Sequence, residues 1–206
     1  MPSEESKISK SRLEALVDGI FAFAMTLLVT GLTIPVLTDA EAASKLPPMV
    51  MEMRSEFVSL LIAFFILASF WLAHHRQFHH VRTVDMNLVR INLCILACVV
   101  VVPFTTSISG DYDHVRIAVD LFHLNLFFLG LLFLVQWWYL NRTPAVTTDR
   151  IPRSDAVSGT RRSLLVPAVA ALGFLVAFID PRISMMVYLL LFPGFFLVSL
   201  WSAEER

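Results

Sequence analysis

The first apolar segment of this chain, residues 11–35, carries polar groups that a plain membrane anchor would not need. Asp18 lies inside it, and hydroxyl groups follow at Thr26, Thr30 and Thr33. A carboxylate within a membrane span is costly unless it is paired or serves a function. The segment is therefore more polar than an anchor requires, and Asp18 in particular needs a partner.

A helical wheel at about 100° per residue separates these polar groups. One face holds an apolar row with the three threonines along its edge: Leu16, Ile20, Phe23, Leu27 and Ile34. Asp18 lies on another face, which it shares with Ala22, Met25 and Val29. The alternative interpretation is that the threonine hydroxyls bond back to carbonyls of their own helix and that the apolar row contacts core or lipid.

Asp18 has two sets of candidate partners. Arg12 lies on the same predicted helix but on a different face, and a cluster at the end of the second apolar run contains His74, His75 and Arg76. A pairing of this kind would make Asp18 a structural clamp. The open alternative is a role in proton relay or gating, because polar groups in membrane spans are often functional.

Composition predicts an all-α membrane protein. Hydrophobic residues make up 57% of the 206 positions and charged residues 16%, and no run has the alternating pattern of a barrel strand. Six apolar runs are long enough to be membrane helices: 12–35, 52–73, 88–109, 116–140, 163–179 and 183–202. The chain is predicted to be one domain, 1–206, with an N-terminal tail over 1–11, an outer loop over 36–49 and an inner loop over 141–162. Ser11 and Glu14 predict a capping box at the start of the first helix.

The distribution of Lys and Arg predicts the orientation. If the N-terminus is cytoplasmic, 12 of the 16 basic residues fall on the inner side and four on the outer side. The positive-inside rule then predicts a multi-pass protein of the cell membrane with both termini cytoplasmic. The net charge of −1 gives no indication of a nucleic-acid partner.

Other polar residues in the apolar runs allow further interpretations. His75 and His79 have the i, i+4 spacing of metal ligands, although no cysteine lies near them. Asp120 and His123 could pair with each other. Asn92 and Asn125 are predicted to hydrogen-bond between helices. Cys94 and Cys98 are predicted to be buried free thiols.

No enzyme motif occurs in the sequence, so an enzyme is not predicted. The Thr-Val-Gly-Tyr-Gly filter of ordinary potassium channels is also absent. A channel built from this sequence would therefore select ions by other means.

Three ordered stretches resemble the prokaryotic, single-repeat branch of the transmembrane protein 175 potassium channels. They cover about the first half of the chain: Arg12-x-x-x-Leu16-Val17-Asp18, Trp71-x-x-His74-His75-Arg76-x-Phe78, and Asp85-x-x-Leu88 through Asn92 to Pro103-Phe104-x-Thr106. Leu16 and Val17 stand where the family has Phe and Ser.

The resemblance implies a homotetramer of six-helix subunits in the lipid bilayer, with the first helices lining a central pore. Phe23 and Leu27 would form a hydrophobic constriction, and Thr26 and Thr30 would lie beside it. An inter-helix network would hold the pore helix in place: Arg12, Asp18, Trp71 and His74. The permeant ion would be potassium, with no cofactor, no metal and no nucleic acid.

Three functions remain open from the sequence. The first is a passive, potassium-preferring cation channel. The second is a proton-coupled transporter with a relay through Asp18, His74 and His123. The third is a haem or metal oxidoreductase of the membrane that uses His75 and His79.

Overall fold

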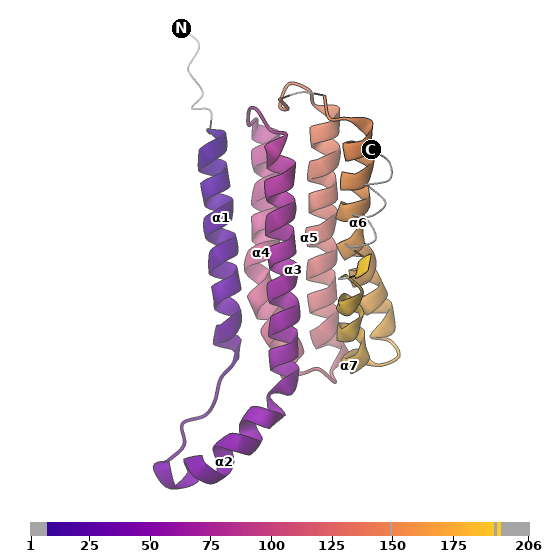
Figure 1. Ribbon diagram of the computed structural model, residues 1–206. Coiled ribbons are helices and arrows are strands. Elements are labelled where there is room, and N and C mark those ends of the chain that lie inside the picture. The colour runs from indigo at the N-terminus through magenta and orange to yellow at the C-terminus, as the bar shows by residue number, and fades with distance from the viewer. Residues whose placement is uncertain (1–7, 149, 192, 195–206) are drawn as a thin grey trace.

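The computed structural model describes residues 8–148, 150–191 and 193–194, and these form a bundle of long helices (Figure 1). Within these residues, five helices are long and apolar enough to cross a membrane. They are α1 (Lys10–Leu27), α3 (Arg54–His79), α4 (Met86–Asp111), α5 (Arg116–Arg142) and α6 (Arg153–Val176). Helix α1 continues as the short 3-10 helix η1 (Leu28–Gly31). The prediction of an all-α membrane protein is therefore confirmed.

The sixth predicted span, 183–202, lies partly outside the described residues, which end at 194. Its described part contains the end of α7, Pro181–Ser184, and the 3-10 helix η2, Met185–Leu190. A helix count of six stays a prediction.

The predicted outer loop over 36–49 is wrong, because most of it is helical. Helix α2, Asp39–Glu52, begins at a capping box formed by Thr38 and Glu41, and Glu41 also pairs with Lys45 at 2.6 Å. It contains Pro47 and Pro48 and buries no residue. The carbonyls that these prolines leave without an amide partner can therefore face solvent, where the loss is cheap. Figure 1 shows α2 lying outside the bundle.

The predicted inner loop over 141–162 is too long. Helix α6 begins at Arg153 with Pro152 at its N-cap, and proline fixes a backbone angle suited to a helix start. Its first turns are rich in charge, so a search for apolar runs places its start at 163. At the other end of the chain, Ser9 caps α1 and accepts a hydrogen bond from the Arg12 amide at 3.4 Å. The predicted start at Ser11 is two residues late.

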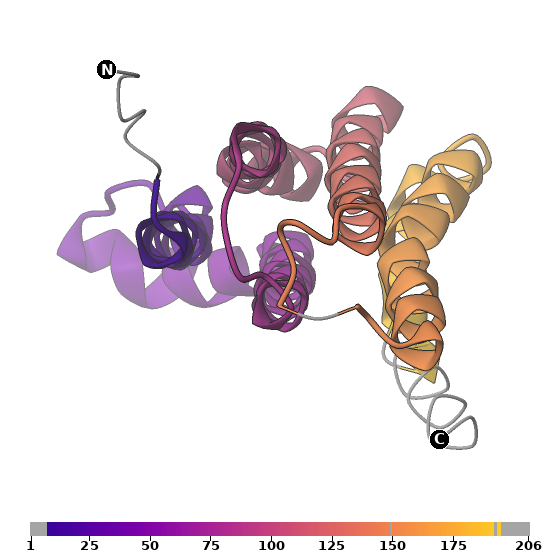
Figure 2. The ribbon, with the colours of Figure 1, turned by 90° about the horizontal axis from the view of Figure 1, so that it is seen from above.

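The bundle is arranged with α1 at one side and α6 at the other, as Figure 2 shows from above. Helix α5 packs extensively against α4 and α6, and α1 packs mainly against α4 and less against α3. The contact between α5 and α6 is close because small residues meet there. A Cβ atom on Gly130 would lie 2.5 Å from Pro167 Cδ, and one on Gly159 would lie 2.4 Å from the Trp137 ring.

Gly130→Ala is expected to lower the free energy of unfolding by about 1–3 kcal/mol, because the proline ring and its backbone cannot move aside. Thermal unfolding of the purified protein in detergent measures this change. Gly19→Ala is the matched control, since a Cβ there meets nothing within 4 Å. Equal melting temperatures for the two variants would show that the helices do not meet at Gly130.

Candidate pore helix and its anchoring network

Helix α1 has one buried face and one open face in the single chain. Its buried residues recur every three to four positions: Leu13, Val17, Phe21, Ala24 and, at the start of η1, Leu28. This is the period of one helix face, so α1 is attached to the bundle along a single stripe. The opposite face carries the residues that the sequence analysis singled out.

The predicted constriction residues lie on or next to this open face. The Phe23 side chain is 63% exposed, Leu16 is 44% exposed, and Ile20 and Leu27 are half-buried. Thr26 and Thr30 are exposed beside them. The helical wheel fails at its outer end, because η1 ends at Gly31 and the chain is no longer helical at Thr33 and Ile34.

Both threonine hydroxyls are held by their own helix. Thr26 Oγ1 donates to the Phe23 carbonyl at 2.8 Å, and Thr30 Oγ1 donates to the Leu27 carbonyl at 2.7 Å. This is the back-bonding that the alternative interpretation expects. It also commits the hydroxyl proton to the helix and leaves oxygen lone pairs free to accept from water or to coordinate a cation.

Asp18 lies on the exposed side of α1 and is joined to α3 by a hydrogen bond. Trp71 Nε1 donates to Asp18 Oδ1 at 2.8 Å. The His75 ring in turn stacks on Trp71, with ring centroids 6.4 Å apart. The indole of Trp71 therefore supplies the carboxylate with a donor, whereas sequence reasoning from charge alone looked for a cation.

His74 continues the polar contacts from α3 to α4. Its side chain is buried, its Nε2 lies 2.9 Å from Asn92 Oδ1, and its ring stacks on Phe78. Asn92 Nδ2 donates to the Leu88 carbonyl at 2.8 Å, so both ends of its amide are satisfied. The structure thus connects α1 to α3 through Asp18 and Trp71, and α3 to α4 through His74 and Asn92.

Arg12 is not part of these contacts. Its side chain is exposed, and within the residues that the structure describes it forms no ion pair with Asp18. Of the four residues predicted to form one network, Asp18 and Trp71 are joined by a hydrogen bond. His74 contacts Asn92 instead.

The second half of the bundle has its own polar cluster, which the sequence analysis paired wrongly. Asp120 pairs with Arg116 at 3.0 Å rather than with His123. His123 is buried between Tyr188, 2.8 Å from its Nδ1, and Ser184, 2.9 Å from its Nε2. The signal for this pairing was missed because Ser184 and Tyr188 lie about 60 residues later in the chain.

The predicted interhelical asparagines are confirmed, since Asn125 Nδ2 also donates across helices, to the Cys98 carbonyl at 3.2 Å. The prediction of buried thiols is wrong, because Cys94 is exposed and Cys98 is half-buried, although both are free. Apolar surroundings can equally be supplied by lipid, so a thiol in a membrane span need not face the protein core.

The histidines do not converge on a metal. His75 lies against Trp71, whereas the His79 ring lies against His80. In the described part of the chain, no three His, Cys, Asp or Glu side chains gather closely enough to hold a metal ion. No hydrogen bond joins any two of Asp18, His74 and His123 there, so the three do not form a direct relay.

A bundle of membrane-length helices defines the class of helical, multi-pass membrane proteins. Residues 12–103 match the family model described as "TMEM175: Endosomal/lysosomal potassium channel TMEM175". The first half of the chain is thus similar to this family of channels.

Similar proteins cover most of the chain. A potassium channel of Streptomyces collinus is 29% identical over 176 residues, which are 81% of this chain and 83% of that protein. The rat endosomal/lysosomal proton channel TMEM175 is 24% identical over 97% of this chain, and only 40% of its own length is matched.

The fold agrees with a solved structure. The crystal structure of a lysosomal potassium-selective channel TMEM175 homolog from Chamaesiphon minutus has a TM-score of 0.78 and 24% identity. The match covers 94% of this chain and 97% of that one. At this identity the likeness establishes the fold, and the residue roles rest on the contacts above.

The hydrogen bond between Trp71 and Asp18 is expected to couple α1 to α3 by about 0.5–1.5 kcal/mol. A double-mutant cycle with Asp18→Ala and Trp71→Phe, read by thermal unfolding, measures this coupling. The control cycle replaces Trp71→Phe with Trp138→Phe, an exposed tryptophan on α5. A coupling no larger than that of the control cycle would show that the bond contributes nothing to the position of α1.

Proposed function

We propose that this chain is a subunit of a potassium-preferring cation channel that conducts passively through a central pore lined by α1. The observation that carries the proposal is the open face of α1, where the exposed Phe23 stands beside Leu27, Thr26 and Thr30. The names of the bacterial relatives, which are potassium channels, support the same assignment.

The assembly is proposed to be a homotetramer of six-helix subunits. Closed cyclic symmetry brings the same surface of every copy to one axis. With α1 at the edge of the bundle, four copies can place their open faces around that axis while the buried stripe stays packed on α3 and α4. Four Phe23 rings and four Leu27 side chains would then narrow the pore.

Conduction past such a constriction is proposed to depend on partial dehydration. A ring of apolar side chains raises the cost of keeping water in the pore and can close it by dewetting. The Thr26 and Thr30 oxygens, with their protons committed to backbone carbonyls, would replace some of the lost water ligands. Selection would thus need no Thr-Val-Gly-Tyr-Gly filter and no cofactor or metal.

The anchoring network is proposed to set the rotation of α1. Trp71 holds Asp18 on one side of the helix, and His74 with Asn92 fixes α3 against α4. Arg12 is proposed to join this network in the assembled channel, where a neighbouring subunit lies beside the start of α1. The whole chain would act as one domain in the cell membrane with both termini cytoplasmic, as the distribution of basic residues predicts.

Phe23→Ala is expected to raise potassium flux about several-fold, because a wider constriction keeps its water more easily. The substitution is also expected to weaken selection against sodium. Efflux from potassium-loaded and from sodium-loaded liposomes that contain the reconstituted protein measures both effects. Phe128→Ala is the matched control, because Phe128 is an exposed phenylalanine on α5, away from the open face of α1. Unchanged flux in Phe23→Ala would remove α1 from the pore.

Current recordings of the reconstituted protein in a planar bilayer separate a channel from a transporter. A current that follows the potassium gradient and reverses at the potassium equilibrium potential supports the proposed channel. Uphill movement of potassium driven by a proton gradient would instead establish the proton-coupled transporter, and a current that follows the proton gradient would match the proton channels named among the mammalian relatives.

Assembly around α1 is expected to bring identical residues of neighbouring subunits together. In a background with Cys94→Ala and Cys98→Ala, Leu27→Cys should form disulfide-linked dimers on oxidation, whereas Phe128→Cys should not. The mass of the purified complex, measured by light scattering, should correspond to four subunits. A monomeric mass, or equal cross-linking at both positions, would contradict the proposed pore.

A further inference from the structure

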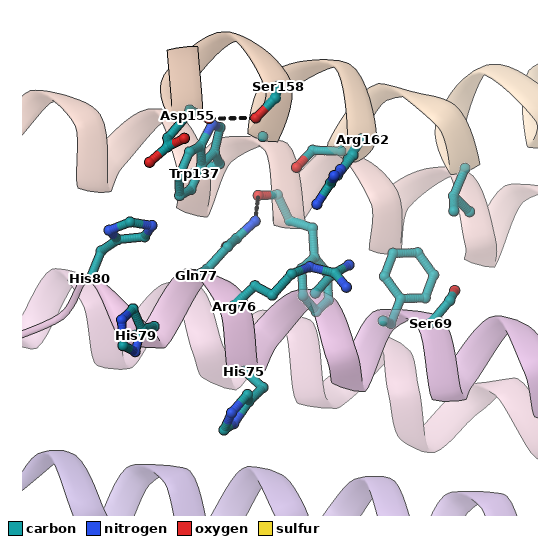
Figure 3. Close-up of a pocket in the computed structure, with 16 residues that line it drawn as sticks. Ser69, His75, Arg76, Gln77, His79, His80, Trp137, Asp155, Ser158 and Arg162 are labelled. Atoms are coloured by element: carbon teal, nitrogen blue, oxygen red, sulfur yellow. Dashed lines mark hydrogen bonds between the residues drawn. The ribbon is translucent and has the colours of Figure 1, made fainter. Parts of the chain in front are cut away.

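A cavity of about 380 Å³ lies between α3, α5 and α6 (Figure 3), and none of its described lining residues comes from α1. It lies within the size range of small-ligand pockets. Its lining extends along α3 from Ser69 to His79, includes His80 just after α3, and extends along α6 from Asp155 to Val166. Nothing in the proposed conduction pathway uses it.

Two arginines face the same part of this cavity. Arg76 comes from α3 and Arg162 from α6, and Figure 3 shows both side chains in the space between the two helices. They lie close enough for their positive charges to repel each other. Among the described residues, no carboxylate forms an ion pair with either guanidinium. Two like charges held together without a counter-ion are unfavourable, so the cavity lacks a negative group that would balance them.

The other polar groups of the cavity do not supply that charge. Asp155 is the one carboxylate among the described lining residues, and Figure 3 shows it beside His80 at the end of the cavity. Burial is the main reason that the pKa of His80 is lowered from its usual value, and Asp155 opposes this shift. His80 therefore adds little positive charge at neutral pH, and the two arginines define the electrostatics of the central part.

The shape and number of the donors indicate the kind of anion. Each guanidinium offers a planar fork of N–H groups that can hold two oxygens of one anion. A carboxylate offers two oxygens and one negative charge, whereas a phosphoryl group offers three oxygens and up to two negative charges, which matches two guanidinium groups better. The Ser163 hydroxyl, which also lines the cavity, can donate to the same group.

We propose that the cavity between α3, α5 and α6 binds a phosphoryl group held jointly by Arg76 and Arg162. The group can belong to the headgroup of an anionic lipid or to a free phosphate compound. The deeper lining is apolar, with Phe70, Phe133 and Val166, and this favours a ligand with an apolar tail. The site also lies at the end of the bundle where α3 ends and α6 begins, close to the basic residues that the positive-inside rule places beside the anionic leaflet.

The test uses the full-length protein in a neutral detergent and two probes, short-chain phosphatidic acid and inorganic phosphate, in calorimetric titrations. Arg76→Gln and Arg162→Gln are each expected to weaken binding by about tenfold or more. Arg82→Gln is the matched control, since Arg82 is an exposed arginine just after α3 that does not line the cavity. Binding of phosphatidic acid alone identifies a lipid headgroup, and competition by inorganic phosphate identifies a soluble phosphate compound. No binding of either probe, or equal binding by the glutamine variants, would overturn the proposal.

Thermal unfolding gives a second and independent reading. Without ligand, Arg162→Gln removes a repulsion and is expected to unfold at a higher temperature than the wild type. With phosphatidic acid, the wild type should gain stability by mass action while Arg162→Gln should not. A loss of stability in unliganded Arg162→Gln would show that this arginine already has a partner, and the proposal would then be wrong.

Discussion

A helix that crosses a membrane satisfies its own backbone hydrogen bonds, so the side chains on its faces alone determine what it contacts. In α1 this constraint divides the helix. The buried stripe from Leu13 to Leu28 holds it against α3 and α4. The hydrogen bond from Trp71 to Asp18 fixes which way the remaining surface points. The exposure of Phe23, Thr26 and Thr30 follows from these two contacts, and the proposed pore depends on that exposure.

The opposite side of the bundle follows a different rule, because α5 and α6 approach so closely that only glycine fits at Gly130, Gly159 and Gly173. At Gly173 the missing side chain makes room for the buried His123 ring. The cavity with Arg76 and Arg162 lies beside this contact, and Gly159 and Trp137 belong to its lining. The closely packed pair of α5 and α6 thus forms one wall of the cavity, and α3 forms the other.

The sequence predicted the spans that consist of unbroken apolar residues, such as α4 and α5, because hydropathy is the dominant signal there. It failed at α6, whose first turns carry several charged residues, and at α2, whose prolines usually end a helix. In both segments local capping by Pro152 or Thr38 outweighs composition. The helical wheel placed Phe23 and Leu27 near the face that carries Thr26 and Thr30, because helix geometry sets the angles between residues of one helix.

Contacts between distant segments were harder to predict. Asp18 was expected to meet a cation, and the structure gives it the indole of Trp71. His123 was expected to meet Asp120, and it binds Ser184 and Tyr188 instead. Periodicity within one helix contains no information about which neighbouring helix faces a polar side chain. The resemblance to a known family did name Trp71 beside Asp18, a relation that the periodicity of a single helix cannot reveal.

The connection between α1 and α2 has a mechanical consequence. Residues 32–38 form no helix, and α2 itself lies outside the bundle. No continuous helix therefore joins α1 to α3, so the backbone between them is not one rigid rod. Within the described residues, α1 and α3 contact each other through the packed stripe of α1 and the hydrogen bond at Asp18. The connecting backbone therefore links α1 to the rest of the chain, whereas the side-chain contacts set its position.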